Sequence, residues 1–593
     1  MSTAMSVADD AAVAWTPPGP GVWESDRLHQ ARPFTTVVAD LWPGAFSDGF
    51  AEAFRRYGFP LETLDARVVH GYAFVRPKVV GEPASGPRRG EPPAWILRLV
   101  MRLVPELRRR NATAVQALAE RRWLADADAW VAERDGWADR FRARQAVDLD
   151  LLDDAALADE LEVTGELTSG MLRRHFALAG LGLGLGDLLL AASGWHLDPE
   201  EVAGLLEGSS PSSQATRVHM RRLAGALRDA GVDVAGLADA HAADPAAALD
   251  VVRGASPVAS SALDDYLTDH GWRATDNTAE APVLAERPDL VVRALVAAAA
   301  EDDAAVAAAA DRVAAAEARQ RGRVPVAERE RFDRLLADAR RVYAVTDEVT
   351  SYVLWAAGVM RRVGVAVGRR LAADGRLHDA GHVVDATTAE LAAALRGEAD
   401  GLADRAATRH AERAVLVAGD VRPPTSLGGE PAPPPPLDVL PAGLAGVVAR
   451  FEAYRRLRAP SAADELAAAG RVLVGGEIVG TGHAVGEGRY TGRACVARSV
   501  EDALERLEPG DVLVCPLTSP SHDPLFTIAG AVVTEEGGPM GHTAVMARET
   551  GVPAVVGTGT VAIVDGDEVT VIVTGPGPAP TPAAGPASPS PDG

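Results

Sequence analysis

The stretch EEGGPMGHTAVMARETGVPAVVG, from Glu535 to Gly557, places two glycines, a histidine, a short helical segment and a strand-forming run in direct succession. It follows the apolar run GAVVT, which is typical of a buried strand. Gly537 and Gly538 allow a tight turn after that strand, and His542 is then expected at the start of the helix TAVMARET. The glycine and the proline in TGVP end that helix. The stretch therefore predicts a strand, a glycine loop and a helix, with the histidine where loop and helix meet.

A histidine at a helix start has a specific chemistry. The first N–H groups of a helix lack partners within it and its dipole is positive there, so the position favours an anion such as a phosphoryl group. Imidazole is largely neutral near pH 7 and nucleophilic, so His542 can accept a phosphoryl group covalently and pass it on. We expect Gly537, Gly538 and Thr543 to hold the phosphoryl group and Arg548 to turn toward it. From spacing alone, the alternative is a capping or packing role for His542.

Length, charge and cysteine count limit the classes of protein. A chain of 593 residues is too long for one hydrophobic core. Its net charge of -24 argues against a nucleic-acid surface, which needs clustered Lys and Arg. Acids such as Asp187 interrupt the apolar stretches, and the N-terminus has no basic region ahead of an apolar one, so neither a membrane span nor a secretory signal is expected. With only Cys495 and Cys515, no disulfide framework or thiolate metal cluster is available. We expect a cytoplasmic protein with no metal site and no nucleic-acid or membrane partner.

The residue pattern changes along the chain and predicts a multidomain protein. Proline, glycine and aromatic residues first predict loops with short strands, and apolar residues at three and four spacing then predict a large, mainly α-helical domain. The stretch VRPPTSLGGEPAPPPPLD predicts a semi-rigid spacer, with an ordinary irregular loop as the alternative. β-branched runs bounded by Gly, Pro or Asp then predict a compact α/β domain. The predicted units are an irregular N-terminal segment packing on the helical domain at 1–90, the helical domain at 91–420, a proline-rich linker with a connecting helix at 421–470, the α/β domain at 471–574 and a disordered tail at 575–593.

The run TEEGGPMGHTAVMARETGVPAVVG closely resembles the phosphohistidine motif in the swivelling domain of phosphoenolpyruvate-utilising enzymes, which include pyruvate phosphate dikinase and phosphoenolpyruvate synthase. The resemblance covers about residues 471–573. In that family the motif histidine carries the phosphoryl group, and it falls on His542. Many relatives have Ser or Thr at the position of Gly541, and several have Trp at the position of His522. We interpret His522 as a surface or packing residue, with a second catalytic histidine as the alternative. The resemblance implies a mobile domain that carries a phosphoryl group between two sites.

The helical region resembles the substrate-binding domain of rifamycin phosphotransferase-like proteins, in the segments DDYLTDHGWRATDNTAEAPVLAERPDLV and RRVYAVTDEVTSYVLWAAGVMRR. Four of its residues are candidates for binding an acceptor. His175 is either a general base or a buried structural histidine, and Arg273 either holds a phosphate or carboxylate or forms a salt bridge. Asp276 is either a base or a turn residue. Glu348 lies either near the acceptor or on a solvated face.

Complete relatives carry an ATP-grasp domain or a barrel that binds phosphoenolpyruvate, and the sequence shows neither pattern. No glycine-rich phosphate loop follows a strand between Pro92 and Val417. The resemblance therefore implies a phosphotransferase component that binds no cofactor alone and passes a phosphoryl group through His542 to a small-molecule acceptor. We expect ATP and Mg²⁺ on a separate ATP-grasp protein. The alternatives are a non-catalytic binding or regulatory protein, and a carrier charged from phosphoenolpyruvate by another protein.

Overall fold

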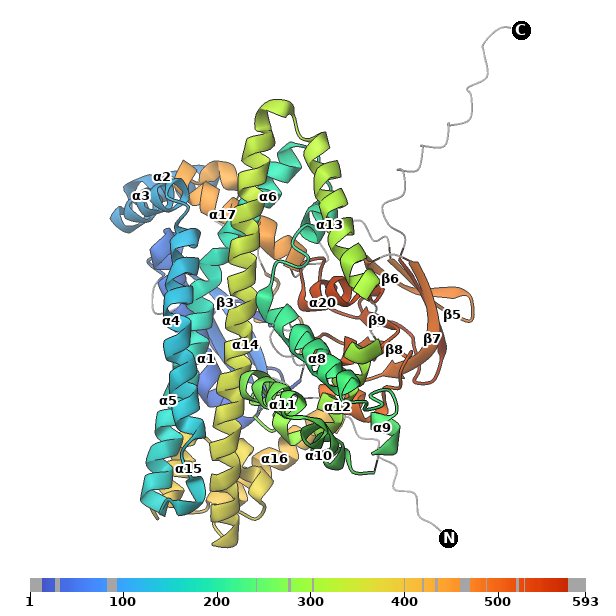
Figure 1. The fold of residues 1–593 in the computed structure, drawn as a ribbon. Coiled ribbons are helices and arrows are strands. Elements are labelled where there is room, and N and C mark those ends of the chain that lie inside the picture. Colours follow the sequence, from blue (N-terminus) through green and yellow to red (C-terminus); the bar gives the residue numbers. More distant parts are fainter. Residues whose placement is uncertain are drawn as a thin grey trace, which may run out of the picture.

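The computed structural model describes most of the chain as a helical body followed by a barrel (Figure 1). The predicted order of a large helical domain and a compact α/β domain is confirmed. The described residues are 13–26, 32–82, 93–241, 243–275, 279–300, 303–398, 400–418, 421–431, 436–458, 470–486, 488–518, 522–526 and 528–573.

The N-terminal part combines a small sheet with a long helix. Four strands pair antiparallel in the order β2-β3-β1-β4: β1 (Trp23–Ser25), β2 (Leu61–Val69), β3 (Tyr72–Val79) and β4 (Ser426–Leu427). The prediction of loops and short strands throughout 1–90 is wrong for α1 (Thr36–Tyr57), which is 22 residues long. Trp42, Phe46 and Phe50 are buried at intervals of four along α1 and pack around Phe176 of the helical body. This packing stabilises the helix by more than the proline and glycines within it destabilise it.

The helical body is built around α14 (Arg329–Ala373), a helix of 45 residues. It packs against α4 (Arg122–Gln145), α5 (Asp154–Ala177) and α6 (Gly182–Gly194), and Figure 1 shows α4, α5 and α14 side by side. Buried side chains from these helices and α1 share one core. A second cluster is formed by α8 (Pro211–Asp229), α10 (Pro245–Ala255), α11 (Pro257–His270) and α12 (Pro288–Ala300). The other helices of the body are α2 (Ala94–Leu103), α3 (Pro105–Ala119), α7 (Pro199–Gly204), α9 (Leu237–Ala240), α13 (Asp303–Arg323), α15 (Thr388–Leu395), α16 (Leu402–Ala418) and α17 (Ala442–Arg458).

The proline-rich region belongs to the helical body where the structure describes it. Strand β4 pairs with β1, and α17 packs against α3 and α6. The connecting helix predicted within 421–470 is present as α17, whereas the described part of the predicted spacer contains a strand that is fixed in the N-terminal sheet. The covalent connection to the barrel runs between Arg458 and Gly470. Residues 432–435, residues 459–469 and the predicted tail lie outside the described residues.

The C-terminal unit is a closed barrel with strand order β10-β6-β5-β11-β7-β8-β9. Neighbours from β7 to β10 are parallel, and the other pairs are antiparallel. Alternate residues face two cores, so that Val512 of β8 packs with other strand residues and Leu513 packs with the helices. The elements are β5 (Gly470–Val474), β6 (Glu477–Val485), β7 (Gly488–Val496), α18 (Val500–Arg506), β8 (Val512–Cys515), α19 (Asp523–Phe526), β9 (Ala531–Thr534), α20 (His542–Thr550), β10 (Ala554–Val556) and β11 (Glu568–Val573).

One stretch of the helical body has the length and hydropathy of a membrane span. It runs from Asp154 to Gly194 through α5 and α6, with a mean hydropathy of 1.7 in its most apolar window. Within the protein 78% of that window is buried. A core helix passes the same test of length and composition, so the stretch is weak evidence for a membrane.

Candidate active site

The loop between β9 and α20 has the predicted form. Gly537 has a φ of 111°, a backbone conformation that residues with a side chain rarely adopt. The N–H of Gly541 donates to the carbonyl of Gly538 over 2.8 Å, which closes the loop. Helix α20 then begins at His542 and ends at Gly551, whose φ is 73°. His542 therefore stands in the first turn of a nine-residue helix, where backbone N–H groups have no helical acceptor.

The residues around His542 are held on both sides. Its ring meets Phe526 edge-on, with 6.5 Å between ring centroids. The next residue, Thr543, is 2% exposed, and its hydroxyl lies 2.8 Å from the hydroxyl of Thr518. The N–H of Met540 donates over 2.9 Å to the carbonyl of Leu457 at the end of α17. The histidine loop is thus docked on the helical body.

The structure gives Arg548 a bracing position. Its Nη1 donates over 2.6 Å to the carbonyl of Pro539, which lies three residues before the histidine. Burial lowers the pKa of Arg548 from its ordinary value, while Tyr343 and Glu207 act in the opposite direction. Arg548 is not among the described side chains that line the cavity at His542. The guanidinium therefore supports the loop through a backbone carbonyl instead of facing an anion on the histidine.

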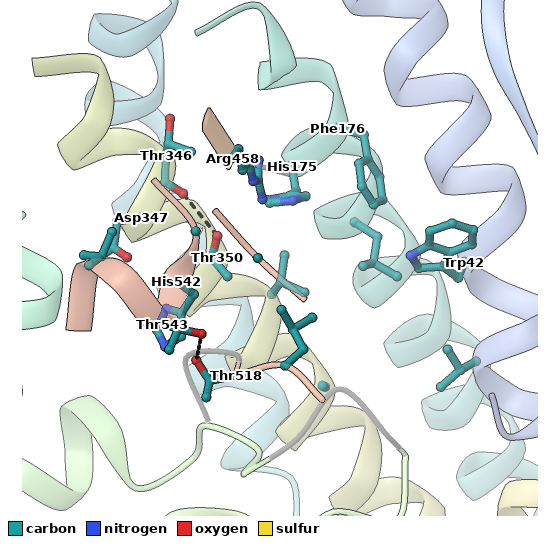
Figure 2. A pocket seen from close by; sticks show the side chains of 18 of the residues that line it. Trp42, His175, Phe176, Thr346, Asp347, Thr350, Arg458, Thr518, His542 and Thr543 are labelled. Carbon is teal, nitrogen blue, oxygen red and sulfur yellow. Dashed lines mark hydrogen bonds between the residues drawn. The ribbon is translucent and has the colours of Figure 1, made fainter. Parts of the chain in front are cut away.

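His542 opens onto a cavity of about 230 Å³ between the barrel and the helical body. Figure 2 shows His542, Thr543 and Thr518 on one side of this cavity, and Trp42 and Phe176 on the other. Most of its lining is aliphatic or aromatic. The barrel contributes Leu517, Thr518, Gly537, Met540, Gly541, His542, Thr543 and Val545, and the body contributes Phe34, Val37, Val38, Leu41, Trp42, Thr168, Leu172, His175, Phe176, Ala279, Tyr343, Thr346, Asp347, Thr350, Val353, Ala357, Met360, Tyr454 and Arg458.

Of the predicted acceptor residues, His175 lines the cavity and Glu348 does not. His175 lines the cavity, with its ring edge-on to Phe176 at 4.9 Å. Glu348 projects from another face of α14 and is not part of the lining. Its carboxylate accepts hydrogen bonds from Trp130 Nε1 at 2.7 Å and Arg134 Nη1 at 2.9 Å. Glu348 therefore joins α14 to α4 and does not reach the site.

Arg273, the third acceptor candidate, is not brought to His542. The backbone N–H of Arg273 donates to the carbonyl of His270 over 3.0 Å, outside the cavity lining. Burial lowers the pKa of His270 to about 2, and the charge of Arg273 adds to this effect. Asp276 lies outside the described residues.

Sequence reasoning missed the polar residues that α14 and α17 place in the cavity. Asp347 accepts a hydrogen bond from Ser210 Oγ at 2.6 Å. Burial raises the pKa of Tyr343 well above its ordinary value, and Asp347 raises it further, so this phenol stays protonated. Arg458 donates to the hydroxyl of Tyr454 over 3.1 Å. Their spacing could have shown that they act together, since Tyr343 and Asp347 are four residues apart and therefore share a helix face.

Within the part of the chain that the structure describes, no three His, Cys, Asp or Glu side chains are arranged to hold a metal ion. Asp347 is the one acid, and Arg458 the one guanidinium, among the described residues that line the cavity. The imidazoles of His542 and His175 both line this mostly apolar space, and that of His542 stands at a helix start. This arrangement suits transfer of a group between the histidine and a molecule held by the helical body.

Comparisons with known proteins match two stretches of the chain. Residues 507–575 match the model for the mobile domain of phosphoenolpyruvate-utilising enzymes, and residues 177–348 match the fourth domain of rifampicin phosphotransferase. The chain therefore contains two stretches that are similar to domains of phosphoenolpyruvate-utilising phosphotransferases. The predicted resemblance is confirmed at this level.

Several curated relatives match parts of the chain. A phosphoenolpyruvate synthase of Aeropyrum pernix is 51% identical over 83 residues, which are 14% of this chain and 10% of the relative. An uncharacterised phosphotransferase of Bacillus subtilis is 43% identical over 83 residues, with the same shares of 14% and 10%. An uncharacterised protein of Mycobacterium bovis is 38% identical over 135 residues, covering 20% of this chain and 15% of the relative. The chain thus spans only a small part of the length of these relatives.

Proposed function

We propose that this chain is the phosphoryl-carrier and acceptor-binding component of an ATP-dependent phosphotransferase. The observation that supports it is the position of His542 at a helix start, on the wall of a cavity whose other walls belong to the helical body. A nucleophilic imidazole in that position can hold a phosphoryl group next to a bound acceptor. Two transfers through one histidine replace a single direct transfer.

The donor in this proposal is a separate ATP-grasp protein that binds ATP and Mg²⁺, phosphorylates His542 and releases AMP and phosphate. In the described part of the chain, the strands form the small N-terminal sheet and the barrel, which leaves no further sheet for a nucleotide-binding fold. Because His542 faces the acceptor cavity in this structure, the barrel must leave the helical body to meet a donor. Most of the catalytic effect would come from positioning and charge stabilisation, as in other phosphoryl transfers.

The test is formation of phosphohistidine. The chain is incubated with labelled ATP, Mg²⁺ and a candidate ATP-grasp protein encoded beside its gene, and phosphohistidine is located by mass spectrometry. We expect label on His542 in the wild type and none in His542→Ala, because alanine cannot form the bond to phosphorus. The exposed His378, paired with Asp404 far along the chain, provides a control as His378→Ala.

Two outcomes would count against the proposal. If His542→Ala retains normal labelling on another histidine, His542 is not the carrier. If His542 is labelled neither by ATP with the donor nor by phosphoramidate, a direct chemical donor, then the site does not carry phosphate. Circular dichroism of each variant shows that the fold is retained.

A further inference from the structure

One face of the middle part of α14, from Tyr343 to Met360, lines the cavity. Apart from the adjacent pair Thr346 and Asp347, successive lining positions on this helix are three or four residues apart and form one stripe: Tyr343, Thr346, Asp347, Thr350, Val353, Ala357 and Met360. At 1.5 Å per residue, the stripe from Tyr343 to Met360 extends over roughly 25 Å. The cavity of about 230 Å³ is therefore lined by this stripe over that length.

The polarity of the stripe changes along the helix. Its first half carries a phenol, two threonine hydroxyls and a carboxylate, and its second half is aliphatic from Val353 to Met360. The neighbouring helices continue the apolar half with side chains such as Leu41 of α1 and Leu172 of α5. A molecule that fills the cavity therefore needs a polar end and an extended apolar part.

The polar end is the end where the barrel docks. The pKa of Tyr343 is raised by Asp347 and by Glu549 and lowered by Arg548, so residues of α20 lie near the same stretch of α14. Figure 2 shows Asp347 and His542 on the same side of the cavity. Ser210 Oγ, from the residue that precedes α8, fixes the Asp347 carboxylate at 2.6 Å. His542 and a positioned carboxylate thus both line the polar end of the cavity.

We propose that the acceptor is an elongated, uncharged apolar alcohol, and that Asp347 takes the proton of its hydroxyl group. This inference rests on the proposed function. The alcohol oxygen forms a bond to phosphorus, the bond between phosphorus and the His542 nitrogen breaks, and the electron pair returns to the imidazole. The hydroxyl proton passes to the Asp347 carboxylate, and the products are the phosphate monoester and free His542.

The lining disfavours an acceptor with an anionic tail. A carboxylate at the far end of the molecule would be buried against Val353, Ala357 and Met360, where no described lining residue offers a cation. The guanidinium among the described lining residues, Arg458, is on α17 and is hydrogen-bonded to Tyr454. A neutral tail avoids this desolvation cost.

The first experiment measures binding alone. Decanol, butanol and decanoate are titrated by calorimetry into the full chain with His542→Ala, so that no transfer occurs. We expect affinity for straight-chain alcohols to rise by roughly fourfold for each methylene group that enters the cavity. Decanoate should bind at least about tenfold more weakly than decanol, because its charge is buried. Equal binding of all three compounds, or no binding of decanol, overturns the proposed acceptor class.

A pair of variants on α14 locates the binding site. Ala357→Phe fills the apolar half of the cavity and should remove most of the gain that decanol shows over butanol. Ala337→Phe adds the same side chain at an exposed position of the same helix and should leave both affinities unchanged. If Ala357→Phe does not weaken decanol binding, decanol does not occupy this cavity. The alcohol series on the unchanged cavity tests the length dependence even if Ala357→Phe does not fold.

The second experiment measures transfer without the protein donor. The chain is phosphorylated on His542 with phosphoramidate, and decyl phosphate is measured by mass spectrometry after decanol is added. Asp347→Asn should slow its formation by about 100-fold or more while decanol affinity changes less than twofold, as for loss of a general base. An unchanged rate removes Asp347 from the reaction. If the wild-type chain binds decanol but His542 cannot be phosphorylated, the proposed function is refuted and the assignment of decanol to the cavity still stands.

Discussion

Arg548 and Glu348 show how a single residue position decides whether a side chain reaches the site. Both are charged and lie close along the chain to residues that line the cavity. However, Arg548 binds the carbonyl of Pro539, and Glu348 binds Trp130. Asp347, which precedes Glu348, lines the cavity because one residue turns a helix by about 100°. Sequence reasoning identified His542 from a long motif. It could not choose between neighbouring positions on α14, because that choice depends on which helices pack there.

The bracing position of Arg548 leads to a prediction about the loop. Arg548→Ala removes a charge-assisted hydrogen bond to Pro539 and should lower the free energy of unfolding by about 1.5–3 kcal/mol. Transfer through His542 should weaken only partly, because the loop loses support while the nucleophile remains. Urea unfolding and the rate of phosphohistidine formation are measured together. A variant of full stability with abolished transfer would show that Arg548 contacts the phosphoryl group directly.

At the scale of elements, the glycines of α6 explain a sequence pattern that composition alone left open. The stretch AGLGLGLGD forms part of η2 (Leu178–Leu181) and α6, where glycines let neighbouring groups approach closely. A Cβ at Gly186 would lie 2.0 Å from the carbonyl oxygen of Arg450 on α17, and one at Gly180 would lie 2.0 Å from the ring of Tyr57. The glycines thus allow α17 to pack into the body.

Gly186→Ala should therefore be destabilising even though alanine favours helix. Overpacking against a backbone carbonyl that cannot rotate away costs about 1–3 kcal/mol, which exceeds the gain of up to about 1 kcal/mol in helix propensity. Gly194→Ala, at the end of the same helix, has no neighbour within 4 Å of the added Cβ and is the matched control. Urea unfolding compares the two variants, and equal stabilities would mean that α17 is not closely packed there.

The capping box of α15 supplies a prediction about pH. Glu390 accepts hydrogen bonds from Arg409 and from the N–H of Thr387, and Arg409 contributes most to lowering its pKa from 4.5 to about 2. A lowered folded-state pKa stabilises the protein above about pH 4.5, and this contribution is lost as the pH falls toward 2. Glu390→Gln should cost about 1–3 kcal/mol at pH 7.

The difference between wild type and Glu390→Gln should stay constant from pH 7 to about pH 5 and should shrink as unfolding is measured from about pH 4.5 down toward pH 2. Glu412→Gln changes an exposed carboxylate on the neighbouring helix α16 and should show no such trend. A constant difference between about pH 4.5 and pH 2 would mean that charge on Glu390 does not contribute.

Helix α1 marks the limit of element prediction in this chain. The three and four spacing of apolar residues predicted the helices of the body, and runs of β-branched residues predicted the strands of the barrel. In α1, Pro43 and two glycines obscured the pattern, although Trp42, Phe46 and Phe50 recur at every fourth residue. Their environment is created by α5, which lies more than a hundred residues away, so local propensity did not reveal it.

At the scale of the whole molecule, the barrel and the helical body meet through apolar contacts at the centre and charged contacts at the rim. Met540 joins the core of the body. At the rim, Arg422 Nη1 lies 3.0 Å from Glu535 Oε2, whereas the 2.9 Å contact between His483 Nδ1 and Glu200 is mostly buried. Exposed ion pairs contribute about 0–1 kcal/mol and are screened by salt. A docked state held partly in this way can be released by a small change in free energy.

Arg422→Ala should therefore shift the barrel toward release from the body. Small-angle scattering is expected to give a larger radius of gyration than for the wild type, and high salt should increase that of the wild type. Arg98→Ala removes an equally exposed arginine from an ion pair within the body, that of Arg98 with Asp438, and should leave the radius unchanged. If neither Arg422→Ala nor salt alters the scattering, the rim pairs do not control docking.

Under the proposed function, the shared wall of the cavity also sets an order of events. Because the histidine loop itself closes one side, the acceptor meets an open groove on the body while the barrel is elsewhere, and an enclosed chamber only after the barrel arrives. An arriving phosphohistidine thus finds the groove either already occupied or filled with water, which competes for the phosphoryl group. Productive turnover requires the acceptor to enter first, and futile hydrolysis should fall as the acceptor concentration rises.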